Sequence, residues 1–79
     1  MNKSDEVVID ARPIIASGGE PFGAIMDAVG RLQADQSLVV LAPFDPVPLE
    51  GVLGEQGFDF AVEEMAPGDW RVKFTRATG

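Results

Sequence analysis

Two alternating apolar runs near the end of the printed sequence constrain the fold more than any other feature. A turn sequence, Pro67-Gly68-Asp69, separates them. The runs consist of every second residue: Phe58, Phe60 and Val62 in the first, and Trp70, Val72 and Phe74 in the second. Alternate side chains of a strand share one face, so each run predicts a strand with one buried face. Two such strands joined by a short turn form a β-hairpin.

The register of this hairpin follows because both apolar sets must reach the same face. A slip of one residue turns every side chain of a strand to the opposite face. An even loop over 66–69 would separate the two sets, whereas an odd loop over 65–69 keeps them together. The odd loop predicts these opposed pairs: Val62 with Val72, Phe60 with Phe74, Glu64 with Trp70, and Glu63 with Arg71.

Strands and helices alternate in the rest of the chain. Glu6 to Ala11 is rich in β-branched residues and predicts a strand, and Leu38 to Ala42 is an unbroken apolar run, which is typical of a central strand covered on both faces. Between them, a helix is expected to begin at Pro21. Its apolar face has the helical spacing of Phe22, Ile25, Met26, Val29 and Leu32. Residues 14–20 read as a loop in which Ser17-Gly18-Gly19 is the flexible element.

A second helix is expected from Asp45 to about Gln56. Asp45 would be its N-cap carboxylate and Pro46 its first helical residue, with an apolar side that includes Val47, Leu49, Val52 and Leu53. The order is then β-α-β-α-β-β. Right-handed crossovers place both helices on one face of a four-stranded mixed sheet, which is an α/β two-layer sandwich. We expect one domain over residues 1–79, with an ordered core of about 6–76.

Composition excludes several kinds of chemistry. The 79 residues contain no cysteine and no histidine, so the chain offers no thiol, persulfide or imidazole group. The net charge of −7 disfavours nucleic acid and anionic lipid, and the longest apolar stretch, Leu38 to Phe44, is too short to span a bilayer. The first six residues lack the apolar core of a signal peptide, so we expect a cytoplasmic protein without a membrane partner.

Three segments resemble the small TusA-like (SirA-like) sulfur-carrier fold, and more closely an uncharacterised bacterial branch of it. They are Asp10-Ala11-Arg12, Asp45-Pro46-Val47-Pro48-Leu49 and Trp70-Arg71-Val72. The resemblance implies the two-layer fold already derived. In the sulfur carriers a Cys-Pro-x-Pro motif supplies the reactive thiolate at the first helix, whereas the matching stretch here is Gly18-Gly19-Glu20-Pro21. Relatives in the branch often have histidine before the Asp-Pro, where this chain has Phe44.

The candidate binding residues follow the first two strands at their carboxyl ends. They are Arg12, Glu20, Phe44, Asp45, Pro46, Pro48 and Leu49. Ligands of open α/β sheets bind off this edge, and the apolar residues of 44–49 exceed what one helix face can bury. A structural interpretation is that Arg12 only pairs with Asp45 or Glu20.

No residue pattern supports catalysis, a metal or a cofactor. Paired carboxylates occur, but nothing in the sequence marks one of them as desolvated. The function expected is that of a non-catalytic protein-interaction or regulatory module that is not a sulfur carrier, with a small-ligand binding domain that uses the edge near Arg12, Glu20 and Phe44 as the alternative.

Overall fold

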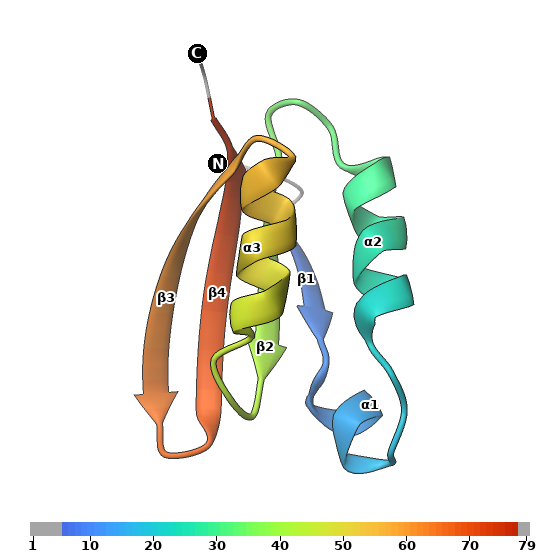
Figure 1. Cartoon of the computed structure of the whole chain (residues 1–79), viewed down its shortest axis with the longest axis vertical. Coiled ribbons are helices and arrows are strands. Elements are labelled where there is room, and N and C mark those ends of the chain that lie inside the picture. Colours follow the sequence, from blue (N-terminus) through green and yellow to red (C-terminus); the bar gives the residue numbers. More distant parts are fainter. Residues whose placement is uncertain (1–5, 78–79) are drawn as a thin grey trace.

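The chain folds into a four-stranded mixed sheet covered on one face by helices. The computed structural model describes residues 6–77. Residues 1–5 and 78–79 of the expected domain lie outside the described residues. The same holds for most of the N-terminal segment for which a signal peptide was considered. The elements are β1 (Glu6–Asp10), α1 (Arg12–Ala16), α2 (Phe22–Arg31), β2 (Ser37–Ala42), α3 (Val47–Glu55), β3 (Phe58–Ala66) and β4 (Asp69–Arg76). The strand order is β1-β2-β4-β3 (Figure 1).

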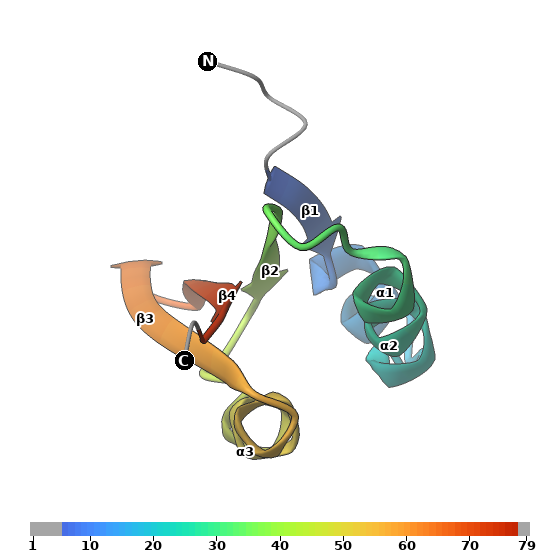
Figure 2. The ribbon, with the colours of Figure 1, turned by 90° about the horizontal axis from the view of Figure 1, so that it is seen from above.

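The sheet combines one parallel and two antiparallel pairings. β1 pairs parallel to β2, and β4 pairs antiparallel to both β2 and β3. Strands β1, β2 and β3 therefore end at the same end of the sheet (Figure 1). Seen from above, the sheet curves, and α2 and α3 lie on the same side of it (Figure 2). The expected two-layer α/β sandwich is confirmed.

The core lies between the covered face of the sheet and the two longer helices. β2 and β4 supply its centre with Leu38, Val40, Val72 and Phe74, and the helices add Ile25, Val29, Leu49 and Leu53. β2 is a central strand and is buried along most of its length, as its unbroken apolar run predicts.

The hairpin register is confirmed. Val62 is opposite Val72, and Phe60, Glu63 and Glu64 also have their expected partners. The turn itself is shorter than expected, because Ala66 pairs with Asp69 and only Pro67 and Gly68 connect the strands. A bulge between Glu64 and Ala66 takes up the odd residue, Met65. Gly68 has a φ of +75°, which the position after proline in such a turn requires.

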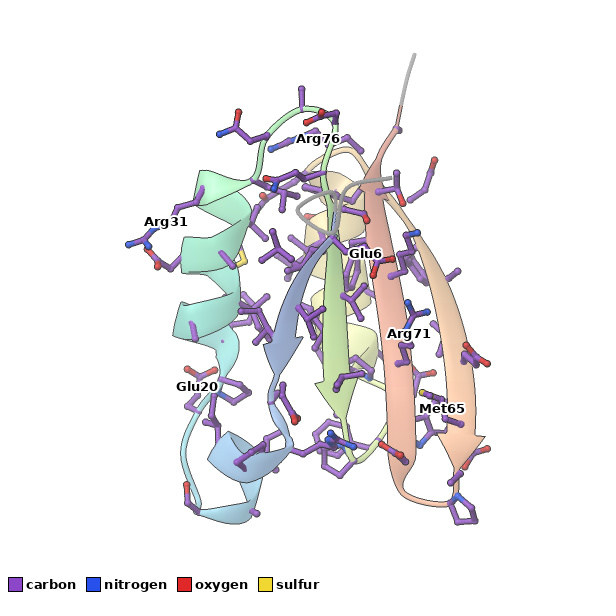
Figure 3. The ribbon with its side chains drawn as sticks, turned by 180° about the vertical axis from the view of Figure 1, so that it is seen from behind. Glu6, Glu20, Arg31, Met65, Arg71 and Arg76 are labelled. Atoms are coloured by element: carbon purple, nitrogen blue, oxygen red, sulfur yellow. The ribbon has the colours of Figure 1, made fainter. Side chains whose placement is uncertain are left out.

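The face of the sheet away from the helices is covered by charged side chains. Glu6 Oε2 lies 3.2 Å from Lys73 Nζ and 3.7 Å from Arg71 Nη2, so one carboxylate joins β1 to β4 across β2 (Figure 3). Val39, on this face of β2, is buried without a helix over it. Glu63 is across the hairpin from Arg71, but the ion pair of Arg71 that the structure shows is with Glu6.

The expected loop over 14–20 is wrong in its first half, where the chain forms α1. Pro13 is in the first turn of this helix, where a missing N–H costs nothing. Ser17-Gly18-Gly19 is the helix terminus rather than a flexible element: the Gly19 N–H donates to Ile14 O at 2.8 Å and the Gly18 N–H to Ile15 O at 3.0 Å. These two bonds form a Schellman motif, and Gly18 has the positive φ, +84°, that it requires.

The two phenylalanines opposed in the hairpin differ in burial, which the sequence does not predict. Phe74, in the centre of the sheet, is fully buried, whereas Phe60, in the edge strand β3, is 46% exposed. Their ring centroids are 6.1 Å apart, so Phe60 covers one side of Phe74.

We predict that Phe74→Ala lowers the free energy of unfolding by about 3–5 kcal/mol, because it leaves a cavity in the core. Phe60→Ala is expected to cost only about 1–2 kcal/mol, because half of its area is already in water. Urea denaturation of both variants tests this. Equal losses of stability would contradict the difference in burial.

Candidate functional site

An apolar pocket lies at the carboxyl ends of β1 and β2, between α1, α2 and the start of α3. Its volume is about 230 Å³. The parallel pairing of β1 with β2 continues into the site, where the Ala11 N–H donates to Leu41 O at 2.8 Å. The residues that line the pocket are Ala11, Ile15, Glu20, Pro21, Phe22, Ile25, Val40, Ala42, Phe44, Pro46, Pro48 and Leu49.

The structure brings most of the sequence-predicted site residues together in this pocket. Glu20, Phe44, Pro46, Pro48 and Leu49 line it, whereas Arg12 and Asp45 do not. Sequence reasoning missed the contribution of α1 through Ile15, because that segment read as a loop. It also placed Phe22 on the buried face of its helix, but Phe22 is partly exposed and lines the pocket.

The lining is apolar apart from one carboxylate. Glu20 precedes α2, and its Oε2 accepts the Phe22 N–H at 2.8 Å, which satisfies a donor in the first turn of the helix. Phe44 lines the pocket and is 51% exposed, so it forms part of the rim. Pockets for drug-sized ligands usually measure about 300–1,000 Å³. The smaller volume of about 230 Å³ is suited to one apolar group such as a single side chain.

Arg12 does not line the pocket. Its side chain joins Asp10, at the end of β1, to Asp69, at the start of β4. Its Nε and Nη2 donate to the two carboxylate oxygens of Asp10, at 2.8 and 2.9 Å, and its Nη1 lies 2.8 Å from Asp69 Oδ1. The suggested pairing with Asp45 or Glu20 is therefore wrong. The hydrogen bonds from Arg12 hold the pKa of Asp10 below its usual value, and those to Asp10 and Asp69 raise the pKa of Arg12.

Asp45 does not cap α3 as the sequence suggested. The helix begins at Val47, its N-cap residue is Pro46, and no side chain makes a capping hydrogen bond. An Asp45 cap would need N–H donors two or three residues on, and Pro48 has none. The remaining donor, the Val47 N–H, bonds to the main-chain oxygen of Asp45 at 2.8 Å. Pro46 has φ −80° and ψ 66°, so this is an inverse γ-turn.

The Asp45 side chain instead faces Glu50, in the first turn of α3. Glu50 is only 7% exposed, and its carboxyl group lies close to that of Asp45. Burial, the side-chain hydrogen bond that a protonated Glu50 can donate to Asp45, and the charge of Asp45 raise the pKa of Glu50 from 4.5 to about 7. The pair therefore holds a proton near neutral pH.

Both carboxyl groups also contain an unsatisfied atom. Asp45 Oδ1 and Glu50 Oε2 are buried and have no hydrogen-bond partner within residues 6–77. Such atoms destabilise a structure, and where they occur beside a pocket they mark a candidate functional group. Glu50 was not singled out from the sequence. The sequence does contain one signal that Glu50 is buried. It lies next to Leu49 and three residues before Leu53, and both leucines are buried residues of the same helix.

Other kinds of site find no support in the part of the chain that is described. No three acidic side chains of residues 6–77 are placed to hold a metal ion together. Over the same residues, each helix is too short, or not apolar enough, to cross a membrane.

Comparison with known proteins gives one match. The profile of a family described as "Uncharacterized conserved protein (DUF2249)" matches residues 8–76, a span that includes every residue lining the pocket. No curated protein and no solved structure matches the chain.

We predict that the Asp45–Glu50 pair makes the protein less stable as pH rises. The unfolded chain releases the Glu50 proton near pH 4.5, whereas the folded chain keeps it up to about pH 7. Stability from this group is therefore fully present below pH 4.5, falls between 4.5 and 7, and is constant above. The fall is on the order of 3 kcal/mol.

Denaturation of wild type and Glu50→Gln at several pH values measures this contribution as a difference. Glu55→Gln, an exposed position at the end of the same helix, is the matched control. The difference between wild type and Glu50→Gln should change across this pH range, and that for Glu55→Gln should not. A Glu50→Gln profile parallel to wild type would exclude the raised pKa.

Proposed function

We propose that this protein, which belongs to the DUF2249 family of uncharacterized conserved proteins, is a non-catalytic module that binds a partner protein. The partner inserts one apolar side chain into the pocket at the carboxyl ends of β1 and β2. The observation that carries the proposal is the pocket itself: an apolar cavity of about 230 Å³ with a half-exposed aromatic residue, Phe44, at its rim. Buried apolar anchors surrounded by a polar rim supply most of the affinity of protein interfaces.

The pocket wall favours docking without large rearrangement. Pro46 and Pro48 both line it, and proline restricts the backbone before a partner arrives. Less conformational entropy is then lost on binding. The exposed part of Phe44, at the mouth of the pocket, extends the contact area beyond the cavity.

Charge around the pocket favours a basic partner segment. The net charge of the chain is −7. Arg12, the cation nearest in sequence to the site, is bound by two carboxylates, Asp10 and Asp69, and Glu20 adds a further negative charge to the lining. An apolar side chain flanked by lysine or arginine would be attracted to this rim, and an acidic segment would be repelled.

The chemistry at the pocket supports a binding role over catalysis. The carboxylate that lines it, Glu20, accepts a hydrogen bond from the backbone of α2, and no residue of the chain is cysteine or histidine. The alternative of a small-ligand binder would use the same cavity. Arg12 supports that alternative less well, because it does not line the pocket and its guanidinium is already paired.

The TusA-like resemblance is part of the proposal. The strand and helix order supports such an affiliation with a bacterial, cytoplasmic family. Because Gly18 stands where the sulfur carriers have their cysteine, the protein would use the fold for binding and not for sulfur transfer.

We predict that Phe44→Ala reduces capture of the partner at least about tenfold, because Phe44 at the mouth of the pocket would be an aromatic anchor at the centre of the interface. Val47→Ala is the matched control, because Val47 is a 59% exposed apolar residue of the same segment that does not line the pocket. The measurement is quantitative affinity capture from lysate with each folded variant. Unchanged capture by Phe44→Ala, or an equal loss with Val47→Ala, would rule out this pocket as the site.

A further inference from the structure

The Asp45–Glu50 carboxyl pair does not line the pocket, but its two residues are direct chain neighbours of residues that do. Asp45 lies between two lining residues, Phe44 and Pro46, and Glu50 follows a third, Leu49. We propose that this pair couples occupancy of the pocket to uptake of a proton, so that the pocket binds its apolar group more tightly at acidic than at alkaline pH. The inference rests on the proposed function and adds its regulation.

Ionisation of both carboxyl groups acts directly on the wall. Each group has a buried oxygen without a partner among the described residues, and two adjacent buried carboxylates repel each other. The repulsion is relieved if the segment before α3 moves so that water reaches the carboxylates. That movement displaces Phe44 and Pro46, so the ionised pair favours an open wall and a pocket that is not formed.

No basic group offsets the charge of the pair within residues 6–77. The cations are engaged elsewhere: Arg12 with Asp10 and Asp69, Arg31 with Asp27, Arg71 and Lys73 with Glu6 on the other face, and Arg76 above Phe58. On the helix-covered face, β2 and β4 present Val40, Ala42, Trp70 and Val72. β3 presents Phe60, Val62 and one more carboxylate, Glu64, and α3 itself ends with Glu55. The surroundings therefore favour the protonated pair.

The direction of the coupling follows from linkage. We call the wall closed when the segment before α3 is in place and the carboxyl pair is buried. In this state Glu50 keeps its proton up to about pH 7, whereas a carboxyl group exposed to water loses its proton near pH 4.5. A ligand that binds only the closed wall therefore favours the protonated pair, and by reciprocity protonation favours the ligand. The affinity should fall as pH rises between these values and then level off.

The test uses toluene, a neutral apolar ring of the size of one phenylalanine side chain, which has no charge of its own to confound the measurement. Its dissociation constant is measured by NMR titration at pH 5.5 and pH 8 for wild type, Glu50→Gln and Glu55→Gln. We expect the wild-type affinity to be at least about fivefold lower at pH 8, within the usual range of coupling between sites. Glu55→Gln should match wild type, and Glu50→Gln should bind equally at both pH values.

Further variants separate the possible failures. Asp45→Asn removes the other member of the pair and should lessen the pH dependence without abolishing it, because burial of Glu50 remains; this variant covers the case in which Glu50→Gln does not fold. Phe44→Ala should weaken binding at both pH values if the probe occupies the pocket. Binding that needs Phe44 but does not change with pH overturns the proton coupling alone. Absence of Phe44-dependent binding at both pH values overturns the proposed function and the coupling with it.

Discussion

The burial of β2 is the constraint on which the other features depend. This strand pairs with β1 on one side and β4 on the other, and it is buried on both faces. On one face the helices cover Leu38 and Val40, and on the other the Glu6 ion pairs with Arg71 and Lys73 lie over the sheet that contains Val39. In this way a small chain buries both faces of its central strand, although helices cover only one face of the sheet. The exposed ion pairs add little stability individually, but their aliphatic stems exclude water from the strand.

The parallel pairing of β1 with β2 also creates the site. It brings two chain segments, 11–22 and 43–49, to one end of the sheet, where no further strand covers them (Figure 1). α1 and its Schellman terminus fold the first segment against the sheet, and the γ-turn at Pro46 directs the second into α3. Pro48 lacks one of the donors that an Asp45 cap would use, and the γ-turn takes the other, the Val47 N–H. The Asp45 carboxyl group is left to pair with Glu50 in the interior, so a local backbone constraint generates a titratable group beside the pocket.

Sequence reasoning predicts the features that depend on period and parity. Alternation fixes the hairpin register from Phe60 and Val62, and the unbroken run at 38–42 identifies the central strand. It fails where the outcome depends on competing local bonds. Proline in the first turn and glycine after the last turn, as at Pro13 and Gly18, are typical of a short helix. Because the glycine-rich segment has no apolar periodicity, sequence reasoning predicts a loop there instead. The role of Asp45 depends on which donors the prolines leave, and the burial of Glu50 depends on tertiary packing, of which its spacing from Leu49 and Leu53 is only a weak signal.

The Asp45–Glu50 carboxyl pair beside the pocket holds a proton near neutral pH. The most direct measurement is a carbon-13 NMR titration of the Glu50 side-chain carboxyl in the folded protein, with Glu55 in the same spectra as an exposed reference. A midpoint near pH 7 for Glu50 is the predicted result. A midpoint near 4.5, the ordinary value of a glutamate in water, would contradict the claim.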